Sequence, residues 1–275
     1  MLGSMMERDF RRLSEFVQNK CGIKMPSSKK TMMEARLQRR LRALGLADYR
    51  AYCEYVFSPK GTESEIPHLI DALSTNTTSF FREPHHFQYL TSSVLPSWWQ
   101  NNGHERELAV WSAGCSSGEE PYTLAMVLAE FMEHHPLFRW FILATDINTQ
   151  VLERAAKGIY PDDRLNSIPA QLRTKYLLRS KDRSKKLIRI IPALRERIHF
   201  RRLNFMEKFA FREPMDIIFC RNVMIYFERD VQERLIRNFL EYLHPLGHLV
   251  IGHSESLAGM NLGLRQVAPT VYGKA

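Results

Sequence analysis

Apolar side chains in the first 73 residues recur every three or four positions, which is the spacing of amphipathic helices. Gly45 and the turn-forming stretch 58–61 interrupt the pattern, because glycine and proline tend to break helices. We therefore expect an all-helical N-terminal domain over residues 1–75, with helices at Phe10–Lys20, Lys30–Leu44, Ala47–Phe57 and Glu63–Leu73.

The pattern changes at residue 108, where short apolar runs begin to alternate with amphipathic helical stretches. The run that starts at Leu108 and the runs Trp140–Thr145 and Met215–Phe219 are typical of strands in a buried parallel sheet. The other expected elements are the helices Glu83–Leu95, Pro121–His134, Thr149–Lys157 and Arg229–His244, and the strands His248–Gly252, Arg265–Ala268 and Thr270–Tyr272. This order predicts an open, mostly parallel α/β sheet within residues 76–275.

Residues 160–202 interrupt the alternation of strands and helices. They contain the short β-like runs Leu187–Ile191 and Ile198–Phe200, together with an excess of basic side chains. We expect a small β-subdomain to be inserted at about 160–202, in place of another strand–helix unit of the main sheet.

Seven small residues in a row, Ser112–Gly118, join the first strand of this sheet to the following helix. Such a turn lets a ligand approach the backbone closely, although it lacks the G-x-G-x-x-G spacing of dinucleotide-binding turns. Glu119 and Glu120 follow at once, and their carboxylates would repel a pyrophosphate but suit a cationic or hydroxyl-rich ligand. An ordinary strand–helix connection would show the same small residues.

Asp146 follows the second strand of the predicted sheet, where nucleotide-binding folds place an acid that binds the ribose hydroxyls. It could instead, or in addition, cap the helix Thr149–Lys157. Asn204 and the stretch Cys220–Tyr226 also fall at strand ends. Because ligands of open α/β sheets bind at the carboxyl ends of the strands, this convergence predicts one binding site.

The stretch Ser74–Phe87 carries several hydrogen-bonding side chains between Asn76 and Ser79, and the guanidinium of Arg82 can bind an anion with two parallel hydrogen bonds. A capped loop before a helix would have a similar composition. His85 and His86 are adjacent, but the sequence places no acid or thiol partner beside them that would make a metal site. No metal site is expected.

The composition is that of a soluble globular protein, with 44% hydrophobic and 25% charged residues. The sequence shows no membrane-spanning run and no signal peptide, and its four cysteines are scattered without a C-x-x-C pair. These features favour a cytoplasmic protein with reduced thiols. Lysine and arginine exceed aspartate and glutamate by 39 to 30, which favours an acidic partner, either nucleic acid or protein.

Basic residues concentrate between Lys20 and Arg42, where Glu34 is the single acid. Arg36, Arg39 and Arg40 share one face of a predicted helix, because they are three and four residues apart. This face is either a docking surface for an acidic partner or a solvated surface.

Five stretches resemble the CheR-type chemotaxis receptor methyltransferases: NTTSFFRE, WSAGCSSGEEPYTLA, ATDIN, IFCRNVMIYF and GHSES. Members of that family transfer a methyl group from S-adenosylmethionine to glutamate side chains of chemoreceptors. The resemblance implies a Rossmann-like methyltransferase domain with a small β-subdomain, preceded by an all-helical N-terminal domain. It runs from the N-terminal helices to about Tyr272.

The resemblance also assigns roles to residues of this chain. Arg82 and Tyr226 are the implied catalytic residues, with Tyr226 facing the reacting methyl group. The implied cofactor-binding residues are Asn76, Thr78 and Arg82 along the site, Ala113 and Glu120 at the methionyl end, Asp146 at the ribose, Asn204 and Phe205 at the adenine, and Cys220 and Arg221 at the amino-acid portion.

The implied partners are the cytoplasmic methylation helices of chemoreceptors, bound through Arg36, Arg39 and Arg40, with neither nucleic acid nor membrane insertion involved. A nucleic-acid methyltransferase is the first alternative, but its D/N-P-P-Y/F type motif is missing from Cys220–Tyr226. A non-enzymatic chemotaxis adaptor is the second, and it would not need Arg82, Asp146 and Tyr226 together. Relatives that tether to a receptor's C-terminal pentapeptide carry glycines in the subdomain loop, whereas Leu178–Ile191 has none, so no tether is expected.

Overall fold

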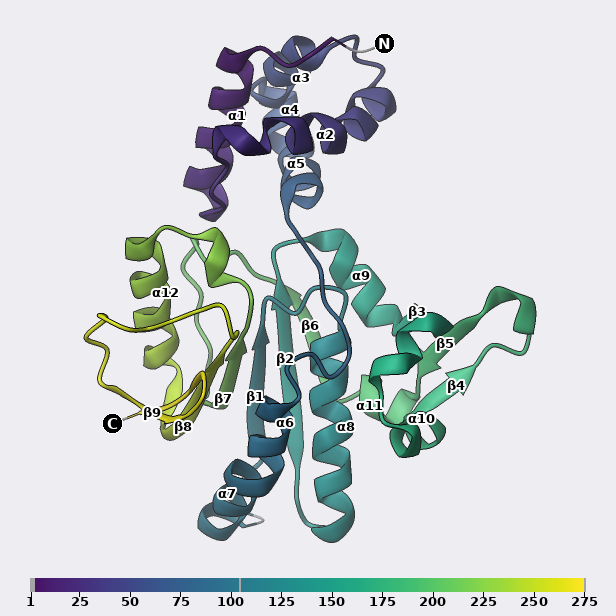
Figure 1. Ribbon diagram of the computed structural model, residues 1–275, viewed down its shortest axis with the longest axis vertical. Coiled ribbons are helices and arrows are strands. Elements are labelled where there is room, and N and C mark those ends of the chain that lie inside the picture. Colours follow the sequence, from purple (N-terminus) through teal and green to yellow (C-terminus); the bar gives the residue numbers. More distant parts are fainter. Residues whose placement is uncertain (1–2, 104, 275) are drawn as a thin grey trace.

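Figure 1 shows the computed structural model of the protein, which describes residues 3–103 and 105–274. Five helices form the N-terminal part, drawn in purple and blue at the top: α1 (Glu7–Cys21), α2 (Lys30–Leu44), α3 (Tyr49–Val56), α4 (Pro59–Ser64) and α5 (Ile66–Leu73). Gly22 and Gly45 end α1 and α2 in the left-handed conformation, at φ 74° and 65°. Asp48 caps α3 by accepting the Ala51 N–H, so this helix starts two residues later than expected.

A seven-stranded sheet forms the centre of the remaining chain. Its strands, in spatial order, are β6 (Ile198–Arg202), β2 (Trp140–Asp146), β1 (Leu108–Ala113), β7 (Met215–Cys220), β8 (Leu243–Ile251), β10 (Val271–Lys274) and β9 (Leu264–Ala268). The first five run parallel, and β10 pairs antiparallel with both of its neighbours, β8 and β9, which confirms the predicted open, mostly parallel sheet. The carboxyl ends of β1, β2 and β7 meet at one edge.

Strand β1 is buried on both faces, as its continuous apolar pattern predicts. Leu108 and Val110 belong to a core shared with α6 (His85–Tyr89), α7 (Leu95–Asn102) and α8 (Glu119–His134). Trp111 belongs to the opposite core, where its ring lies 4.9 Å from that of Phe239 on α12 (Arg229–Glu241). Its indole N–H also donates to Thr145 Oγ1 at 2.9 Å, which satisfies the polar end of a fully buried side chain.

A second, three-stranded antiparallel sheet projects from the main body on the right of Figure 1. It consists of β3 (Ile159–Pro161), β5 (Leu187–Ile190) and β4 (Leu177–Arg179), with α9 (Thr149–Lys157), α10 (Ala170–Tyr176) and α11 (Pro192–Arg195) along the same stretch of chain. Strand β6, however, pairs in parallel with β2 at the edge of the main sheet. The expected end of the insertion at about 202 is therefore too late, because so short a run does not reveal which sheet it joins.

Two helix predictions differ from the structure in their boundaries. The helix expected at Glu83–Leu95 starts at His85, because Glu83 has a φ of 57°, and continues through a π-helical turn (Leu90–Val94) into α7. In that turn the Leu95 N–H donates to the Leu90 carbonyl, so the helix continues without a break into α7, in which Pro96 is one of the first residues. The helix expected to reach His244 ends at Glu241, because β8 begins at Leu243.

The helical N-terminal part lies over the carboxyl edge of the main sheet (Figure 1). The side-chain amide of Asn204 donates to the Lys20 carbonyl at 2.8 Å, and the Lys24 N–H donates to the Tyr226 carbonyl at 2.9 Å. A Cβ at Gly22 would lie 3.0 Å from Met206 Sδ, so the two parts are in close contact there. Among the helices that the structure describes, none has the length and apolarity needed to cross a membrane.

Candidate cofactor and active site

A pocket opens between the carboxyl edge of the sheet and the N-terminal helices. Most of the residues singled out from the sequence line it: Asn76, Thr78, Arg82, Glu120, Asp146, Asn204, Phe205, Arg221 and Tyr226. The fold thus brings together side chains from the segment after α5, from the ends of β1, β2 and β7, and from the loop after β6. The convergence predicted at the strand ends is observed.

Ala113 and Cys220 do not line the pocket, contrary to the expectation that they contact the cofactor. Both are the last residues of their strands, and both are at most 1% exposed within the core beneath the site. The residues that follow them, Gly114 and Arg221, reach the pocket instead. Because successive residues of an extended chain point to opposite faces, the residue after a buried strand end is the one that faces the pocket.

The small-residue turn needs its glycines for close packing and for its backbone conformation. Gly114 and Gly118 have φ values of 86° and 97°, and a Cβ at Gly114 would lie 2.4 Å from Val223 Cγ2. The N–H groups of Gly114 and Cys115 both donate to the Thr145 carbonyl, at 2.8 and 2.9 Å. The end of β1 and the end of β2 are therefore joined directly beneath the pocket.

Asp146 is buried at the end of β2, and backbone N–H groups hold both of its oxygens. Oδ2 accepts from Ser116 at 2.8 Å and Oδ1 from Asn148 at 2.9 Å. Each oxygen retains lone pairs with which it can accept further hydrogen bonds from the pocket. Burial raises the pKa of Asp146, against the lowering effect of these backbone hydrogen bonds. Asn148, not Asp146, caps α9 through the Val151 N–H, so the capping alternative for Asp146 is wrong.

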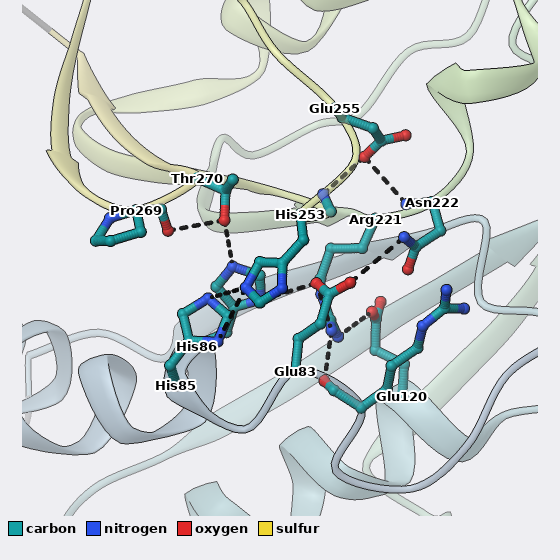
Figure 2. Close-up of polar contacts among 12 residues, drawn as sticks. Glu83, His85, His86, Glu120, Arg221, Asn222, His253, Glu255, Pro269 and Thr270 are labelled. Carbon is teal, nitrogen blue, oxygen red and sulfur yellow. Dashed lines mark hydrogen bonds and ion pairs between the residues drawn. The ribbon is translucent and has the colours of Figure 1, made fainter.

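Arg221 lies at the centre of a buried ion-pair network (Figure 2). One guanidinium nitrogen binds Glu120 Oε2 at 2.9 Å, and the other binds Glu83 Oε2 at 3.0 Å and the Arg82 carbonyl. Ser112 Oγ donates to the other Glu120 oxygen at 2.8 Å. Burial acts to raise the pKa of Glu83, but the charge and hydrogen bond of Arg221 outweigh it, so this pKa is lowered. Glu83 is thus a carboxylate that fixes Arg221.

Glu255 is a site-forming residue whose role the sequence did not reveal. Its buried carboxylate accepts four backbone N–H groups, from Gly252, Asn222, Val223 and Met224, at 2.6 to 3.0 Å. It thereby holds the loop after β7, in which Asn222 has a φ of 58°. Burial raises the pKa of Glu255 despite these donors. Glu255 belongs to the GHSES stretch noted in the sequence, but only the folded structure shows which backbone amides its carboxylate binds.

Arg82 and Tyr226 are both half-buried and line the same pocket. Arg82 Nη1 donates to the Thr77 carbonyl at 3.0 Å. Within the described part of the chain, no carboxylate pairs with Arg82, in contrast to Arg221. Lys29 Nζ lies 5.6 Å from the centre of the Tyr226 ring. Arg82 is therefore a pocket cation with unused capacity to bind an anion.

The N-terminal helices supply an apolar wall that the sequence did not predict, formed by Cys21, Ile23, Met25 and Met32. Phe205 lines the pocket too and packs edge-on against Phe239, at 5.6 Å between ring centres. Asn204 lines the pocket but uses its side-chain amide to hold Lys20 and Glu207. Both residues therefore shape the wall as well as face the cavity.

Comparison with known proteins assigns both parts of the chain to one family. The model of the CheR methyltransferase all-alpha domain matches residues 8–74, and that of the CheR methyltransferase SAM-binding domain matches residues 76–272. The chain belongs to the CheR methyltransferase family. A chemotaxis protein methyltransferase of Borreliella burgdorferi is 42% identical over 267 residues, covering 96% of this chain and 93% of that one. One of Escherichia coli K12 is 37% identical over 270 residues, covering 98% and 91%.

Membership in the CheR family makes this chain an S-adenosylmethionine-dependent methyltransferase of bacterial chemotaxis. The pocket fits this cofactor, because the fixed carboxylate of Asp146 can accept hydrogen bonds from two neighbouring hydroxyls. Gly114 and Val223 pack against each other in the pocket wall, so a side chain at position 114 would displace Val223. Glu120 also lines the pocket, but its carboxylate is paired with Arg221 and accepts from Ser112.

The structure changes the interpretation of the basic helix face. Arg36 donates to the carbonyls of Leu73 and Ser74 at 2.9 Å, and Arg40 forms a bidentate pair with buried Glu65 at 2.8 and 2.7 Å. Both arginines therefore hold the N-terminal helices together. Arg39 alone of the three is exposed.

The histidine pair also gains a partner that the sequence did not place nearby. His253, from the loop after β8, lies with its Nε2 2.8 Å from His85 Nε2. Burial, together with the charge of Arg221, lowers the pKa of His86 to about 3, so this imidazole is neutral. The expectation that no metal site exists rested on the absence of a further ligand, and folding supplies one.

Proposed function

We propose that this CheR methyltransferase transfers the methyl group of S-adenosylmethionine to glutamate side chains of chemoreceptors. S-adenosylmethionine supplies a methyl group bound to a positively charged sulfur. The observation that carries the proposal is that Arg82 and Tyr226 line one pocket, with the charge of Arg82 unpaired by any described carboxylate. An incoming glutamate would provide that missing partner.

The residues around this pocket suit attack by a carboxylate. A glutamate is ionised at neutral pH, so the protein needs no general base. The guanidinium of Arg82 can hold the carboxylate with two hydrogen bonds, and the hydroxyl of Tyr226 can fix its direction. Placing the oxygen in line with the methyl group lowers the barrier, and exclusion of water by the apolar wall favours a reaction that removes charge.

Two conservative substitutions test these roles. Tyr226→Phe removes one hydroxyl, so stability should change by less than about 1.5 kcal/mol, while the single-turnover rate should fall by roughly one to three orders of magnitude. Arg82→Lys keeps the charge but loses the bidentate geometry, so it should be nearly as harmful as Arg82→Ala. A folded, cofactor-saturated Tyr226→Phe protein with the wild-type rate would refute the assignment.

The class of acceptor is tested by the bond that forms. With radiolabelled cofactor and receptor-containing membranes, the label should appear on the receptor as a methyl ester that mild alkali releases. Replacing the receptor's methylated glutamates by alanine should abolish incorporation. Label that resists alkali, or label recovered in nucleic acid, would exclude a glutamate O-methyltransferase.

Docking onto acidic receptor helices is proposed to use the exposed arginines Arg39 and Arg42 of α2. The double change Arg39→Glu, Arg42→Glu should slow methylation of receptor, more so at low salt, and change stability by no more than about 0.5 kcal/mol. Arg40→Glu is the contrasting variant, because it breaks a buried pair and should cost about 3–5 kcal/mol of stability. Normal receptor methylation by the double variant would show that this face is only solvated.

We also propose that the protein works in the cytoplasm without a pentapeptide tether. The turn between β4 and β5 corresponds to the loop that carries glycines in tethering relatives, but here it contains none. Even its left-handed position, at a φ of 46°, is occupied by Lys186. Removing a receptor's last five residues should then leave its methylation unchanged. A large drop in rate after that truncation would show that the tether is used.

A further inference from the structure

Three histidines from two distant parts of the chain gather beside the Arg221 network (Figure 2). His85 and His86 begin α6, and His253 follows β8. One nitrogen from each of the three lies within 4.8 Å of the others. The rings of His85 and His253 are stacked, with centres 4.2 Å apart. A tetrahedral zinc ion, with Zn–N bonds of about 2.0–2.1 Å, spaces its ligand nitrogens roughly 3.4 Å apart, so the spacing suits an ion once the stacked rings turn until their lone pairs converge.

The hydrogen bonds of His86 determine which of its nitrogens is available. Thr270 Oγ1 lies 2.7 Å from the Pro269 carbonyl oxygen and 2.7 Å from His86 Nε2. When the hydroxyl donates its one proton to the carbonyl, it accepts from His86 Nε2, and Nδ1 of that tautomer carries a lone pair. Nδ1 is buried and has no hydrogen-bond partner among the described residues. It faces Glu83 Oε2 at 3.6 Å, which is also an acceptor.

A buried lone pair that faces a carboxylate is unfavourable unless something positive lies between them. We propose that His85, His86 and His253 form a binding site for a divalent transition-metal ion such as Zn²⁺. Neutral imidazole is a preferred ligand of such ions, and the negative charge of Glu83 next to His86 favours a cation. Glu83 or a water molecule would complete the coordination.

The surroundings of His86 match those of a metal-bound histidine. Histidine ligands usually pair their second ring nitrogen with an oxygen that fixes the ring, and His86 Nε2 lies 2.7 Å from Thr270 Oγ1. Thr270 has a φ of 57°, an unfavourable conformation for a β-branched residue in the turn between β9 and β10. Thr270 thus supplies the hydroxyl that contacts His86 at a position where glycine would be less strained.

A metal ion here would join two segments that hold the loop 222–227, which carries Tyr226 and which we call the acceptor side of the pocket. The segment before α6 carries Glu83, which binds Arg221, and the loop after β8 carries Glu255, which binds the amides of residues 222–224. Binding the histidines of both segments to one ion would restrict their relative motion. The site is therefore structural, and the proposal does not depend on which molecule accepts the methyl group.

Binding of Zn²⁺ itself is the direct test. Full-length protein, freed of metal with a chelator, should bind one Zn²⁺ per chain in calorimetry, and Co²⁺ should give the visible absorption of a tetrahedral site. His253→Ala removes an exposed ligand and should weaken the affinity by at least about 10- to 100-fold, the loss typical of changes around a metal site. Zn²⁺ should also slow hydrogen exchange of the amides at 222–224 in the wild type and not in this variant.

The adjacent pair His134 and His135 provides the matched control, because no third ligand accompanies it among the described residues. His134 is exposed, and His134→Ala should bind Zn²⁺ as the wild type does. No stoichiometric binding by the wild type, or equal binding by His253→Ala, would overturn the proposal. Binding that leaves the exchange at 222–224 unchanged would overturn the inferred link between the two segments.

Discussion

On the cofactor side of the pocket, the Thr145 carbonyl accepts from Gly114 and Cys115 of the Ser112–Gly118 turn, and the carboxylate of Asp146 accepts from Ser116. On the acceptor side, side chains far apart in the sequence hold the loops, with Glu83 and Glu255 as the central carboxylates. Unfavourable φ values occur on both sides, at Ser116 on the first and at Glu83 and Asn222 on the second.

The difference separates two ways of fixing a binding site. Backbone hydrogen bonds between parallel strands form wherever the sheet forms, so the cofactor side depends mainly on the fold. Buried carboxylates that bind several N–H groups depend on single side chains, each of which is costly to replace. We therefore expect substitutions on the acceptor side to reduce stability and turnover, and those on the cofactor side to reduce cofactor affinity.

Glu255→Gln should show the largest effect. The change turns one oxygen that accepts two N–H groups into a donor, so two charge-assisted hydrogen bonds worth about 1.5–3 kcal/mol each are lost. The free energy of unfolding in urea should drop by roughly 3–6 kcal/mol. Glu241→Gln on the surface is the control and should change it by less than about 0.5 kcal/mol. Equal stability of the two variants would mean that Glu255 does not hold the loop.

Asp146→Ala should come next and should act on affinity. Two ribose hydroxyls would lose a charged acceptor, which should cost about 2–4 kcal/mol of binding free energy to S-adenosylhomocysteine, the demethylated product. Calorimetry on a variant shown to be folded by circular dichroism measures this loss, with exposed Asp163→Ala as the reference. Unchanged affinity would remove Asp146 from the cofactor site.

A smaller effect should appear in the pH dependence of that affinity. Only the ionised carboxylate of Asp146 accepts from both hydroxyls, so affinity should fall as the pH drops through the pKa of Asp146. Because burial raises this pKa, the fall should begin at a higher pH than for an exposed aspartate. The limiting slope is about tenfold per pH unit. A wild-type profile identical to that of Asp146→Ala would contradict this titration.

The cofactor side could be predicted from the sequence because its signals are local. An apolar run, a small-residue turn and an acid after the next strand occur in chain order, and Gly114 and Asp146 lie where that order places them. Ala113 and Cys220 lie one residue before the pocket lining, since a strand's last core residue and the first pocket residue are neighbours.

The acceptor side and the N-terminal helices could be predicted only in part, because their contacts join distant residues. A helical spacing shows that Arg36 and Arg40 share a face, but not that a buried Glu65 lies opposite Arg40. Likewise, the pair His85–His86 is visible in the sequence. His253, which lies beside the pair in the fold, comes much later in the chain, after most strands of the sheet.

The segment Ser74–Arg82 links the helical N-terminal part to the sheet and at the same time forms one wall of the pocket. Linkers between domains usually tolerate insertion, cleavage and exchange, because few contacts depend on them. This one does not have that freedom, since any added or deleted residue would displace Asn76 and Arg82 from the site. The two parts of the protein are thus inseparable as modules: neither could be recombined with a foreign partner at this junction without rebuilding the pocket.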